Sequence, residues 1–417
     1  MTNLCKNLTS LATGILLFIL VGLLSHGQQQ LQHHLHFAAE AGESVCVEYD
    51  QTENTIHINC NSSLPDVVQA INNPEIVENI GNGEYLLNAT LEVADSVTFE
   101  MNFSNAGGAD NLQYLKIADE NGIIVYGKIL IDGVKITSWN ASSNDVIPQD
   151  TNGTIRRGYI QFAASEGSQI VNSEFAYLGY VEPGRRGFDL LGSGDGEEPS
   201  HDIAIRNSKF HDMWMAFYSR GAYNIVVDGN EYYNNIKYTV DPHTGTYNMN
   251  ITNNYIHHNR IGIICSLDCY NILIEGNVVH HNTEYGIFFS RNMHDSIARN
   301  NHVYNSTTGI TVSESPNNQI YNNTIERASS YGIRLFNPVL PDDGVTETNL
   351  VYNNTIIGSE NGIAAIRSHD NIVENNTFFN IEESEYRLSV DSSIRIKGQY
   401  LDNALISHES SETTISH

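Results

Sequence analysis

A repeat of 23 or 24 residues constrains the fold of this chain more than any other feature. Short apolar runs open on an asparagine, and the spacings between the first five are 23, 24, 23 and 24: Asn207, Asn230, Asn254, Asn277 and Asn301. The series continues through Asn323, Asn354 and Asn376, with one longer interval of 31 residues where FNPVLPDDGVTETN is inserted. Units this short cannot bury an apolar face alone, so they must stack on their neighbours.

The composition of each unit indicates strands. Runs such as YNIVVDGN and YGIFFSR are rich in β-branched and aromatic residues and are broken by Asn, Asp and Gly, and a helical period is absent. We therefore expect an all-β fold, a right-handed parallel β-helix (solenoid) with coils of about 22–24 residues. Ile, Val and Leu should fill its interior and Asn should line internal turns. A β-propeller is disfavoured, because its blades need a repeat about twice as long.

The ends of the chain suggest four segments. Residues 1–27 carry one lysine, an apolar run and then small residues, which predicts a signal peptide and an extracellular or secreted protein; an uncleaved anchor is the alternative. Residues 28–83 are expected to form an N-terminal cap and residues 84–385 the β-helix catalytic domain. Residues 386–417 should form a C-terminal cap and a polar tail.

The net charge of the chain limits its possible binding partners, and its cysteine content indicates an oxidising compartment. Acidic residues number 49 against 21 basic ones, a net charge of −28, which argues against nucleic acid as a partner. A monomer is expected. Ten Asn-x-Ser/Thr sites after the leader permit glycosylation. Without the leader four cysteines remain, and we expect disulfides between Cys46 and Cys60 and between Cys265 and Cys269.

The segment KYTVDPHTG, residues 237–245, departs from the repeat. It places Tyr238, Asp241 and His243 where other coils carry mostly apolar or small side chains. Because side chains alternate along a strand and parallel coils stack in register, Asp241 and His243 should point outward together. Their neighbours on adjacent coils should be Tyr218, Arg220, Ser266, Ser290 and Arg291.

Pro242 strengthens the case for a site at this coil. It removes a backbone donor from inside a predicted sheet, and such local conflicts tend to mark functional positions. The competing interpretation is an ordinary exposed polar pair. The histidines of the HHN segments are expected to be solvated turn residues rather than a metal cluster: His257, His258, His280 and His281. No metal site is predicted, although Ca²⁺ is compatible with the acidic composition.

The run FYSRGAYNIVVDGNEYYNNIKYTVDPHTG resembles the mannuronan C5-epimerases, whose signature is Tyr-Gly-x-Asp-Pro-His followed by an acid. The resemblance implies a right-handed β-helix that converts D-mannuronate to L-guluronate within an alginate-like polymer. It also implies that His243 removes the C5 proton, that Tyr238 acts from the opposite face, and that Asp241 supports the site. Three positions depart from the family pattern: Thr239 replaces Gly, Thr244 replaces the acid, and Leu267 replaces an arginine.

The chemistry of such a reaction explains these residue types. Removing a proton α to a carboxylate requires a cation on that carboxylate, to hold the developing charge. Arg220 is our first candidate because a guanidinium grips a carboxylate with two hydrogen bonds, and Lys237 is the second. Arg260 and Arg291 are further candidates, and Tyr218 and Ser266 complete the expected substrate-binding set. Imidazole suits the base without a large pKa shift.

These expectations together favour a secreted enzyme that acts on an acidic polysaccharide, a polyuronate, by C5-epimerisation without a required cofactor. Two alternatives stay open. A polysaccharide lyase would use the same residues and expel the O4 substituent by β-elimination. A non-catalytic surface β-helix would only bind glycans.

Overall fold

The computed structural model describes residues 45–102, 112–192, 198–338, 348–389, 392–397, 404–406 and 414–416. The chain divides into Met1–Val45 and Cys46–His417, and the described residues lie almost entirely in the second unit. The predicted signal peptide, residues 1–27, lies outside them. No helix within the described ranges is long and apolar enough to cross a membrane.

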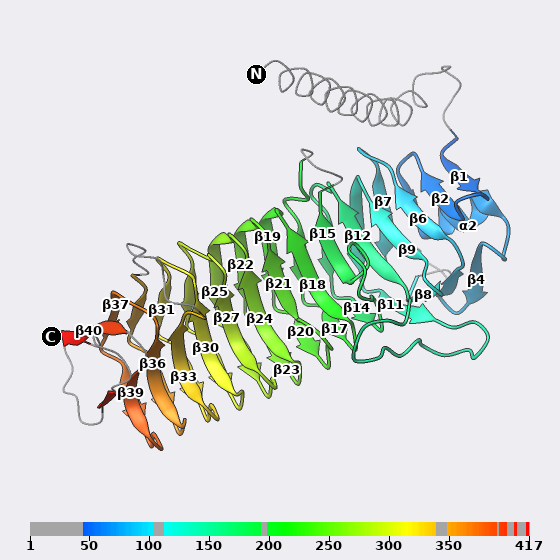
Figure 1. Ribbon diagram of the computed structural model, residues 1–417. Coiled ribbons are helices and arrows are strands. Elements are labelled where there is room, and N and C mark those ends of the chain that lie inside the picture. The colour runs from blue at the N-terminus through cyan, green and yellow to red at the C-terminus, as the bar shows by residue number, and fades with distance from the viewer. Residues whose placement is uncertain are drawn as a thin grey trace, which may run out of the picture. The chain divides into compact units, whose positions relative to one another are not determined.

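Three mostly parallel sheets form the described part of the second unit, and most coils contribute one strand to each sheet (Figure 1). In sheet A the neighbouring strands are β1 (Val47–Asp50), β2 (Thr55–Ile58), β6 (Thr90–Val93), β9 (Gly122–Val125), β12 (Tyr159–Ala163), β15 (Gly187–Leu191), β18 (Met215–Arg220), β21 (Val240–His243), β24 (Ile261–Ser266), β27 (Tyr285–Ser290), β30 (Thr308–Ser313), β33 (Tyr331–Phe336), β36 (Asn361–Ile366), β39 (Ser384–Ser389) and β41 (Ala404–Ile406).

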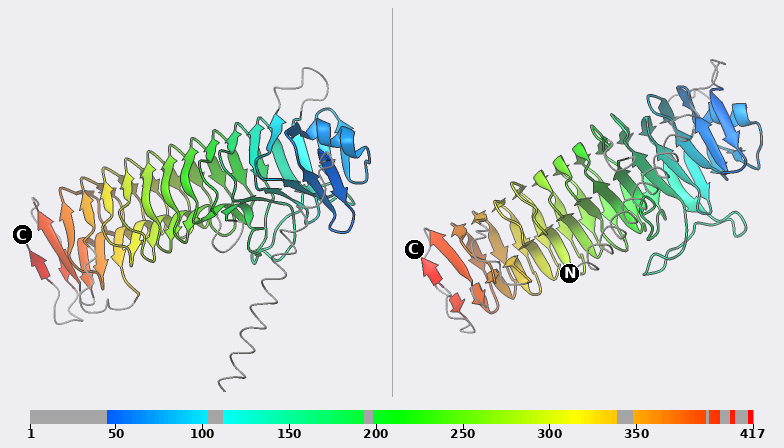
Figure 2. Two further views of the ribbon diagram at one scale, coloured as in Figure 1. Left: turned by 90° about the horizontal axis from the view of Figure 1, so that it is seen from above. Right: turned by 45° about the horizontal axis from the view of Figure 1, so that its top comes forward.

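Sheets B and C run beside sheet A through the same coils (Figure 2). Sheet B comprises β3 (Ser62–Ser63), β7 (Thr98–Asn102), β10 (Lys128–Asp132), β13 (Gln169–Val171), β16 (Ala204–Arg206), β19 (Tyr223–Asp228), β22 (Tyr247–Thr252), β25 (Tyr270–Glu275), β28 (Ile297–Arg299), β31 (Gln319–Tyr321), β34 (Leu350–Tyr352), β37 (Asn371–Glu374), β40 (Ser393–Lys397) and β42 (Thr414–Ser416). Sheet C comprises β4 (Val77–Gly81), β5 (Glu84–Leu87), β8 (Tyr114–Ala118), β11 (Lys135–Trp139), β14 (Glu174–Ala176), β17 (Lys209–His211), β20 (Glu231–Tyr233), β23 (Tyr255–His257), β26 (Val278–His280), β29 (His302–Tyr304), β32 (Thr324–Glu326), β35 (Thr355–Ile357) and β38 (Thr377–Phe379).

The interior of the coils is apolar, as the repeat predicts. One column of apolar residues along sheet A is completely buried: Phe217, Val240, Ile263, Ile287, Ile310 and Ile333. Each pairs in register with the next along sheet A. The predicted all-β parallel β-helix is therefore confirmed.

Asparagines line an internal turn of successive coils from Asn230 onward, whereas the expectation fails for Asn207, which is exposed and leaves this turn position to the buried Ser208. The side chain of Asn254 donates from Nδ2 to Oδ1 of Asn277 at 2.9 Å, and its backbone N–H donates to the same oxygen. The same pairing joins Asn323 to Asn354 at 3.0 Å, across the long interval of the repeat. This asparagine ladder satisfies backbone groups that a buried turn would otherwise leave unpaired.

The ends of the stack lie outside the expected boundaries at residues 84 and 385. Parallel pairing already joins β2 to β6, and it continues from β39 to β41 and from β40 to β42. At the N-terminal end two antiparallel pairs, β1 with β2 and β4 with β5, border the parallel strands. The single helix among the described residues, α2 (Leu64–Ile71), packs against β1, β3, β4 and β7. Covering a sheet edge in this way prevents further strands from adding to it.

One of the two predicted disulfides is present. Cys46 and Cys60 are bonded, which ties the start of the described chain to the segment after β2. The predicted bond between Cys265 and Cys269 is wrong: both are free and buried. Both side chains belong to the apolar interior, and the Cys269 thiol also donates to the carbonyl of Ser266 at 3.2 Å.

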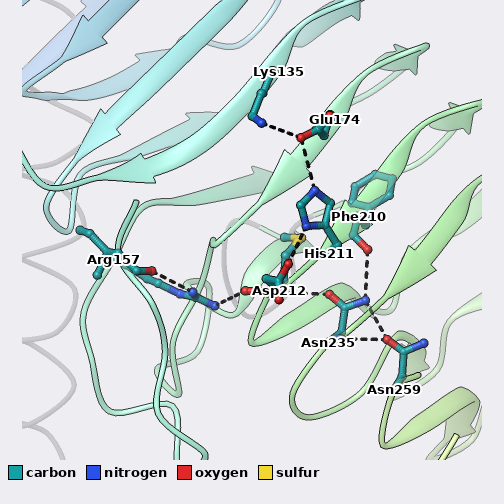
Figure 3. Close-up of polar contacts among 10 residues, drawn as sticks. Lys135, Arg157, Glu174, Phe210, His211, Asp212, Asn235 and Asn259 are labelled. Atoms are coloured by element: carbon teal, nitrogen blue, oxygen red, sulfur yellow. Dashed lines mark hydrogen bonds and ion pairs between the residues drawn. The ribbon is translucent and has the colours of Figure 1, made fainter. Parts of the chain in front are cut away.

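The connection between β11 and β12, residues 140–158, leaves the stack and is anchored by a buried arginine (Figure 3). Arg157 is 0% exposed and donates to the backbone carbonyls of Ile147, Leu178, Gly179 and Asp212 at 2.7–3.2 Å. Burial lowers the pKa of Arg157 to about 9, which still leaves the guanidinium charged at neutral pH. The loop is thus fixed to the turns of the coils that precede the KYTVDPHTG segment.

Candidate active site

The structure places the motif where the repeat register predicts. In sheet A, Tyr218 pairs with Asp241 and Arg220 with His243, and His243 in turn pairs with Ser266. The strands concerned lie side by side in the middle of the stack (Figure 1). Pairing between β21 and β24 occurs at Val240 and His243 but is interrupted between them, around Pro242. Arg220, His243 and Ser266 therefore occupy matching positions on three adjacent strands, as predicted.

His243 is half-buried and lies among cations. Its Nδ1 is 2.6 Å from the hydroxyl of Thr244 and 3.4 Å from that of Tyr218. Burial, reinforced by the guanidinium groups of Arg291, Arg186 and Arg220, lowers the pKa of His243 to about 4. The imidazole is consequently neutral at neutral pH and can accept a proton.

Two buried carboxyl groups flank Tyr218 on neighbouring strands. Asp241 is 1% exposed, and both of its carboxyl oxygens lack a hydrogen-bond partner within the described part of the chain. Burial raises the pKa of Asp241 well above its usual range. Asp189, which pairs with Tyr218 from the other side, is completely buried, and burial raises its pKa to about 7. The alternative of an ordinary exposed polar pair is thus wrong for Asp241.

Arg186 and Asp189 are site residues that the sequence analysis missed. The Arg186 guanidinium lies 4.1 Å from the centre of the Tyr218 ring, and its Nη1 is 3.5 Å from Oδ2 of Asp189. A β-bulge at the start of β15 creates this arrangement, because the register shifts between Gly187 and Asp189. A Cβ on Gly187, which has φ +141°, would lie 2.3 Å from the carbonyl oxygen of Met215. Only glycine therefore allows the bulge to form here.

The amino-acid sequence gives only weak indications that Arg186 and Asp189 belong to the site. Asp189 interrupts the apolar strand GFDLL, and an acid inside a buried strand is uncommon. However, Tyr218 follows Asp189 by 29 residues rather than 23 or 24, so the repeat register does not connect them.

Arg291 extends back toward the coil of Ser266. Its Nη2 and Nε donate to the Ser266 hydroxyl at 2.7 and 3.2 Å. Ser266 pairs with His243 and directly precedes Leu267, the position where the epimerase pattern carries an arginine. A guanidinium from a later coil therefore lies beside that position.

The other predicted cations are arranged differently. Arg220 is exposed, and its side chain forms no ion pair or hydrogen bond with another described residue. Arg260 is engaged, since its Nε lies 2.7 Å from Oε1 of Glu284. Lys237 lies with its Nζ 5.1 Å from the centre of the Tyr238 ring.

Tyr238 is half-buried and packs on the cluster of Trp214, Met215 and Tyr218. Burial raises the pKa of its phenol, and the nearby Asp241 adds to the effect, whereas Arg260 and Arg291 oppose it. The phenol therefore stays protonated at neutral pH. Of the two predicted tyrosines, Tyr218 is the one whose hydroxyl approaches the imidazole of His243.

Comparison with known proteins adds a family context. Residues 187–339 match the family model described as a right handed beta helix region, which confirms the predicted handedness. The mannuronan C5-epimerase of Pseudomonas syringae pv. tomato is 27% identical over 207 residues, 47% of this chain and 36% of that protein. Mannuronan C5-epimerase AlgG of Azotobacter vinelandii is 30% identical over 270 residues, 62% of this chain and 49% of that protein.

Solved structures agree on the fold. A crystal structure of the periplasmic alginate epimerase AlgG matches with a TM-score of 0.64 at 18% identity, over 87% of this chain and 84% of that one. The alignments to the curated relatives, in contrast, cover about half or less of each relative's length. The chain is a right-handed parallel β-helix protein that resembles the mannuronan C5-epimerases.

Proposed function

We propose that this protein is a C5-epimerase that converts mannuronate to guluronate residues within an alginate-like polyuronate. One observation carries the proposal: a neutral, half-buried imidazole, His243, lies among three guanidinium groups on the outer face of a β-helix. The similarity to proteins named mannuronan C5-epimerase supports the same reaction.

The cations bind the substrate carboxylate and stabilise the charge that develops when the C5 proton leaves. Arg291 suits this role because its guanidinium donates to a neutral group, the hydroxyl of Ser266. Its positive charge is therefore not neutralised by a carboxylate of the protein. Arg220 borders His243 on the preceding strand and contributes a second positive charge. Without such cations, the enolate-like intermediate would carry two adjacent negative charges.

His243 acts as the base. In the tautomer that donates Nδ1–H to the Thr244 hydroxyl, at 2.6 Å, the lone pair is on Nε2 and accepts the C5 proton. Thr244 thereby takes over the orienting role of the acid that follows histidine in the epimerase signature. Binding of an anionic sugar offsets the surrounding positive charge, which raises the pKa of the imidazole and makes it a stronger base in the complex.

Reprotonation must come from the opposite face of the sugar ring. A group that is hydrogen-bonded to the base lies on the same face of the sugar ring as the base. This disfavours Tyr218 as the proton donor, because its hydroxyl is 3.4 Å from Nδ1 of His243. Tyr238 is the better donor, because its phenol is protonated and it stands just before the start of β21. Asp189 and Asp241 support this site through Arg186, the cation that interacts with both of them.

We further infer an extracytoplasmic location and an acidic polysaccharide partner. The leader-like residues 1–27 support the location, and so does the likeness to an alginate epimerase, AlgG, that is described as periplasmic. No step of the proposed reaction requires a cofactor.

The test is incubation of the protein with polymannuronate, followed by NMR of the polymer and by ultraviolet absorbance. New guluronate signals are expected without unsaturated ends. His243→Gln should abolish them, whereas the matched control His302→Gln, on sheet C, should retain wild-type turnover. Unsaturated, ultraviolet-absorbing ends would assign a lyase instead. An unchanged polymer, with binding retained, would assign a glycan-binding protein.

A further inference from the structure

Two arginines in the C-terminal half of sheet A lie against one aromatic ring. Arg334 and Phe336 are in β33, and Arg367 directly follows β36 (Figure 1). The guanidinium carbon of Arg334 is 4.0 Å from the centre of the Phe336 ring, and that of Arg367 is 5.3 Å from it. All three side chains are partly exposed. We name them the distal arginine cluster.

Neither guanidinium of the distal arginine cluster forms an ion pair with an acid among the described residues. Nε of Arg334 is buried and has no hydrogen-bond partner there, and Nε of Arg367 donates to the backbone carbonyl of Asn337 at 2.6 Å. Glu314, an exposed acid on the preceding coil, is not paired with either arginine. An aromatic ring attracts a guanidinium without accepting all of its N–H groups, so donors remain available for an anion.

Arg367 repeats the arrangement of Arg291 at the candidate active site. Each residue directly follows a strand of sheet A and has a positive φ, +52° for Arg367 and +55° for Arg291. Each side chain also extends back to the preceding coil, where Arg291 donates to the Ser266 hydroxyl and Arg367 to the Asn337 carbonyl. The same turn position therefore carries a guanidinium with a neutral partner on two coils.

One column of sheet A connects the proposed base to the distal arginine cluster. His243 pairs with Ser266, and the register continues through Ser290 and Ser313 to Phe336. The three serines are small and buried, so this column presents no bulky side chain between His243 and Phe336. Four strand intervals of about 4.8 Å place the two ends of the column about 19 Å apart.

Arg156 and Arg186, on the coils before β18, are paired with acids instead. The two terminal nitrogens of Arg156 lie 2.8 and 2.9 Å from carboxylate oxygens of Glu120 and Glu182. Nη1 of Arg186 lies 3.5 Å from Oδ2 of Asp189. The positive charge along sheet A that no acid neutralises therefore extends from the candidate active site toward the C-terminal coils.

We propose that the distal arginine cluster binds a second carboxylate of the polyuronate chain whose reacting residue lies at His243. The identity of the polymer rests on the proposed function, whereas the cationic cluster itself does not. A polyuronate carries a carboxylate on every residue, so a chain that crosses the strands brings another one to the cluster. Guanidinium groups bind carboxylates through charge-assisted hydrogen bonds, which a neutral glycan does not offer.

The experiment compares a long and a short oligomannuronate in calorimetric titrations. A decamer is long enough to reach both His243 and the cluster, whereas a trimer bound at His243 ends before the cluster. The double variant Arg334→Gln/Arg367→Gln should bind the decamer about tenfold more weakly than the wild type and the trimer equally well. Arg299→Gln, whose guanidinium is paired with Glu275 on sheet B, is the matched control and should leave both affinities unchanged.

Equal decamer affinity of the wild type and the double variant would overturn the proposal, as would no decamer binding by the wild type. An equal loss of affinity for trimer and decamer would overturn it too, because the effect would then not depend on reach. An unchanged melting temperature of the double variant checks that it is folded.

Turnover separates this proposal from the epimerase function. With polymannuronate, the double variant should show a KM about tenfold higher and an unchanged kcat, since the cluster contacts the polymer away from the reacting residue. If the wild type forms no guluronate but the double variant still binds the decamer more weakly, the cluster is upheld as a polyuronate-binding site and the epimerase function is refuted.

Discussion

The functional state of the candidate site rests on His243, whose positive neighbours and partial burial keep it unprotonated. Its pKa of about 4 follows first from burial and then from Arg291, Arg186 and Arg220. Each cation disfavours the imidazolium, so removal of one of them must raise this pKa.

The first prediction concerns that titration. In the free protein the His243 imidazole should titrate near pH 4, and Arg291→Gln should move its titration to higher pH. Arg299→Gln is the matched control, because that guanidinium is held by Glu275 on sheet B, and it should leave the titration unchanged. Histidine NMR signals measured against pH give the answer without any substrate. A titration near the usual value of about 6.5 in the wild type would contradict the environment described here.

Residue-level prediction from sequence succeeded where the repeat register applies. Tyr218, Arg220, Asp241, His243 and Ser266 follow one another at intervals of the repeat, so parallel stacking fixes their neighbours. Asp189 lies before the regular series and behind a bulge, which the register cannot foresee. The approach of Arg291 to Ser266 depends on the conformation of a long side chain, which no spacing encodes.

Among the structural elements, the asparagine ladder couples each coil to the next. Asn277 accepts from the backbone and the side chain of Asn254, and it donates to Asn301 and to the carbonyl of Ile251. Loss of the Asn277 side chain leaves several buried polar groups without hydrogen-bond partners, and each such group lowers the stability of the fold.

The second prediction is that Asn277→Ala lowers the free energy of unfolding by about 2–4 kcal/mol. Asn250→Ala, an exposed position in β22, serves as the control and should change it by no more than about 0.5 kcal/mol. Urea denaturation followed by circular dichroism measures both. Equal effects of the two substitutions would mean that the ladder does not stabilise the coils.

The third prediction follows from the free cysteines of one coil. Burial raises the pKa of the Cys269 thiol to about 12 and that of Cys265 well above its usual value. Thiol reagents at mildly alkaline pH should therefore label neither cysteine in the folded protein and both in denaturant, whereas the bonded Cys46 and Cys60 should resist until reduced. Failure of Cys265 and Cys269 to react in denaturant without a reductant would restore the disulfide that the sequence suggested.

The complete pairing pattern of the cysteines and the exposure of the histidines could not be predicted from the sequence. An even number of cysteines suggested two bridges, but Cys265 points into the apolar interior, which spacing alone does not reveal. Likewise, HHN reads as a turn, yet its first histidine ends a strand and stacks on its counterpart in the next coil.

For the whole molecule, the buried carboxyl groups of the site link stability to pH. The pKa of Asp189 is raised to about 7 in the folded protein, against about 3.9 in an unfolded chain. Between these values the folded state holds a proton that the unfolded state has released. The contribution of Asp189 to stability is therefore complete below about pH 4 and is lost as the pH rises through about 7.

The fourth prediction is that Asp189→Asn flattens this dependence. Between about pH 4 and 7, the free energy of unfolding of the variant should fall less steeply with rising pH than that of the wild type. Asp228→Asn, at the end of β19 on sheet B, is the control and should preserve the wild-type slope. Urea unfolding at several pH values measures the slopes. Parallel curves for Asp189→Asn and the wild type would show that Asp189 is not the group responsible.

The architecture was predictable because one repeat length governs most of the chain. Parallel pairing at that spacing builds three sheets, and their register gives the interior column and the asparagine ladder together. The terminal strands do not carry the repeat markers, so the limits of the stack could not be read from the sequence.

The proposed reaction depends on stacked coils that bring a base and its cations together to exchange the C5 proton of a polyuronate. Its decisive test is reaction with polymannuronate in heavy water, with deuterium at C5 of the product measured by NMR. We predict that every new guluronate residue carries deuterium at C5, and that His243→Gln yields neither guluronate nor label. Guluronate formed without deuterium, or labelling that persists in His243→Gln, would show that His243 does not exchange this proton.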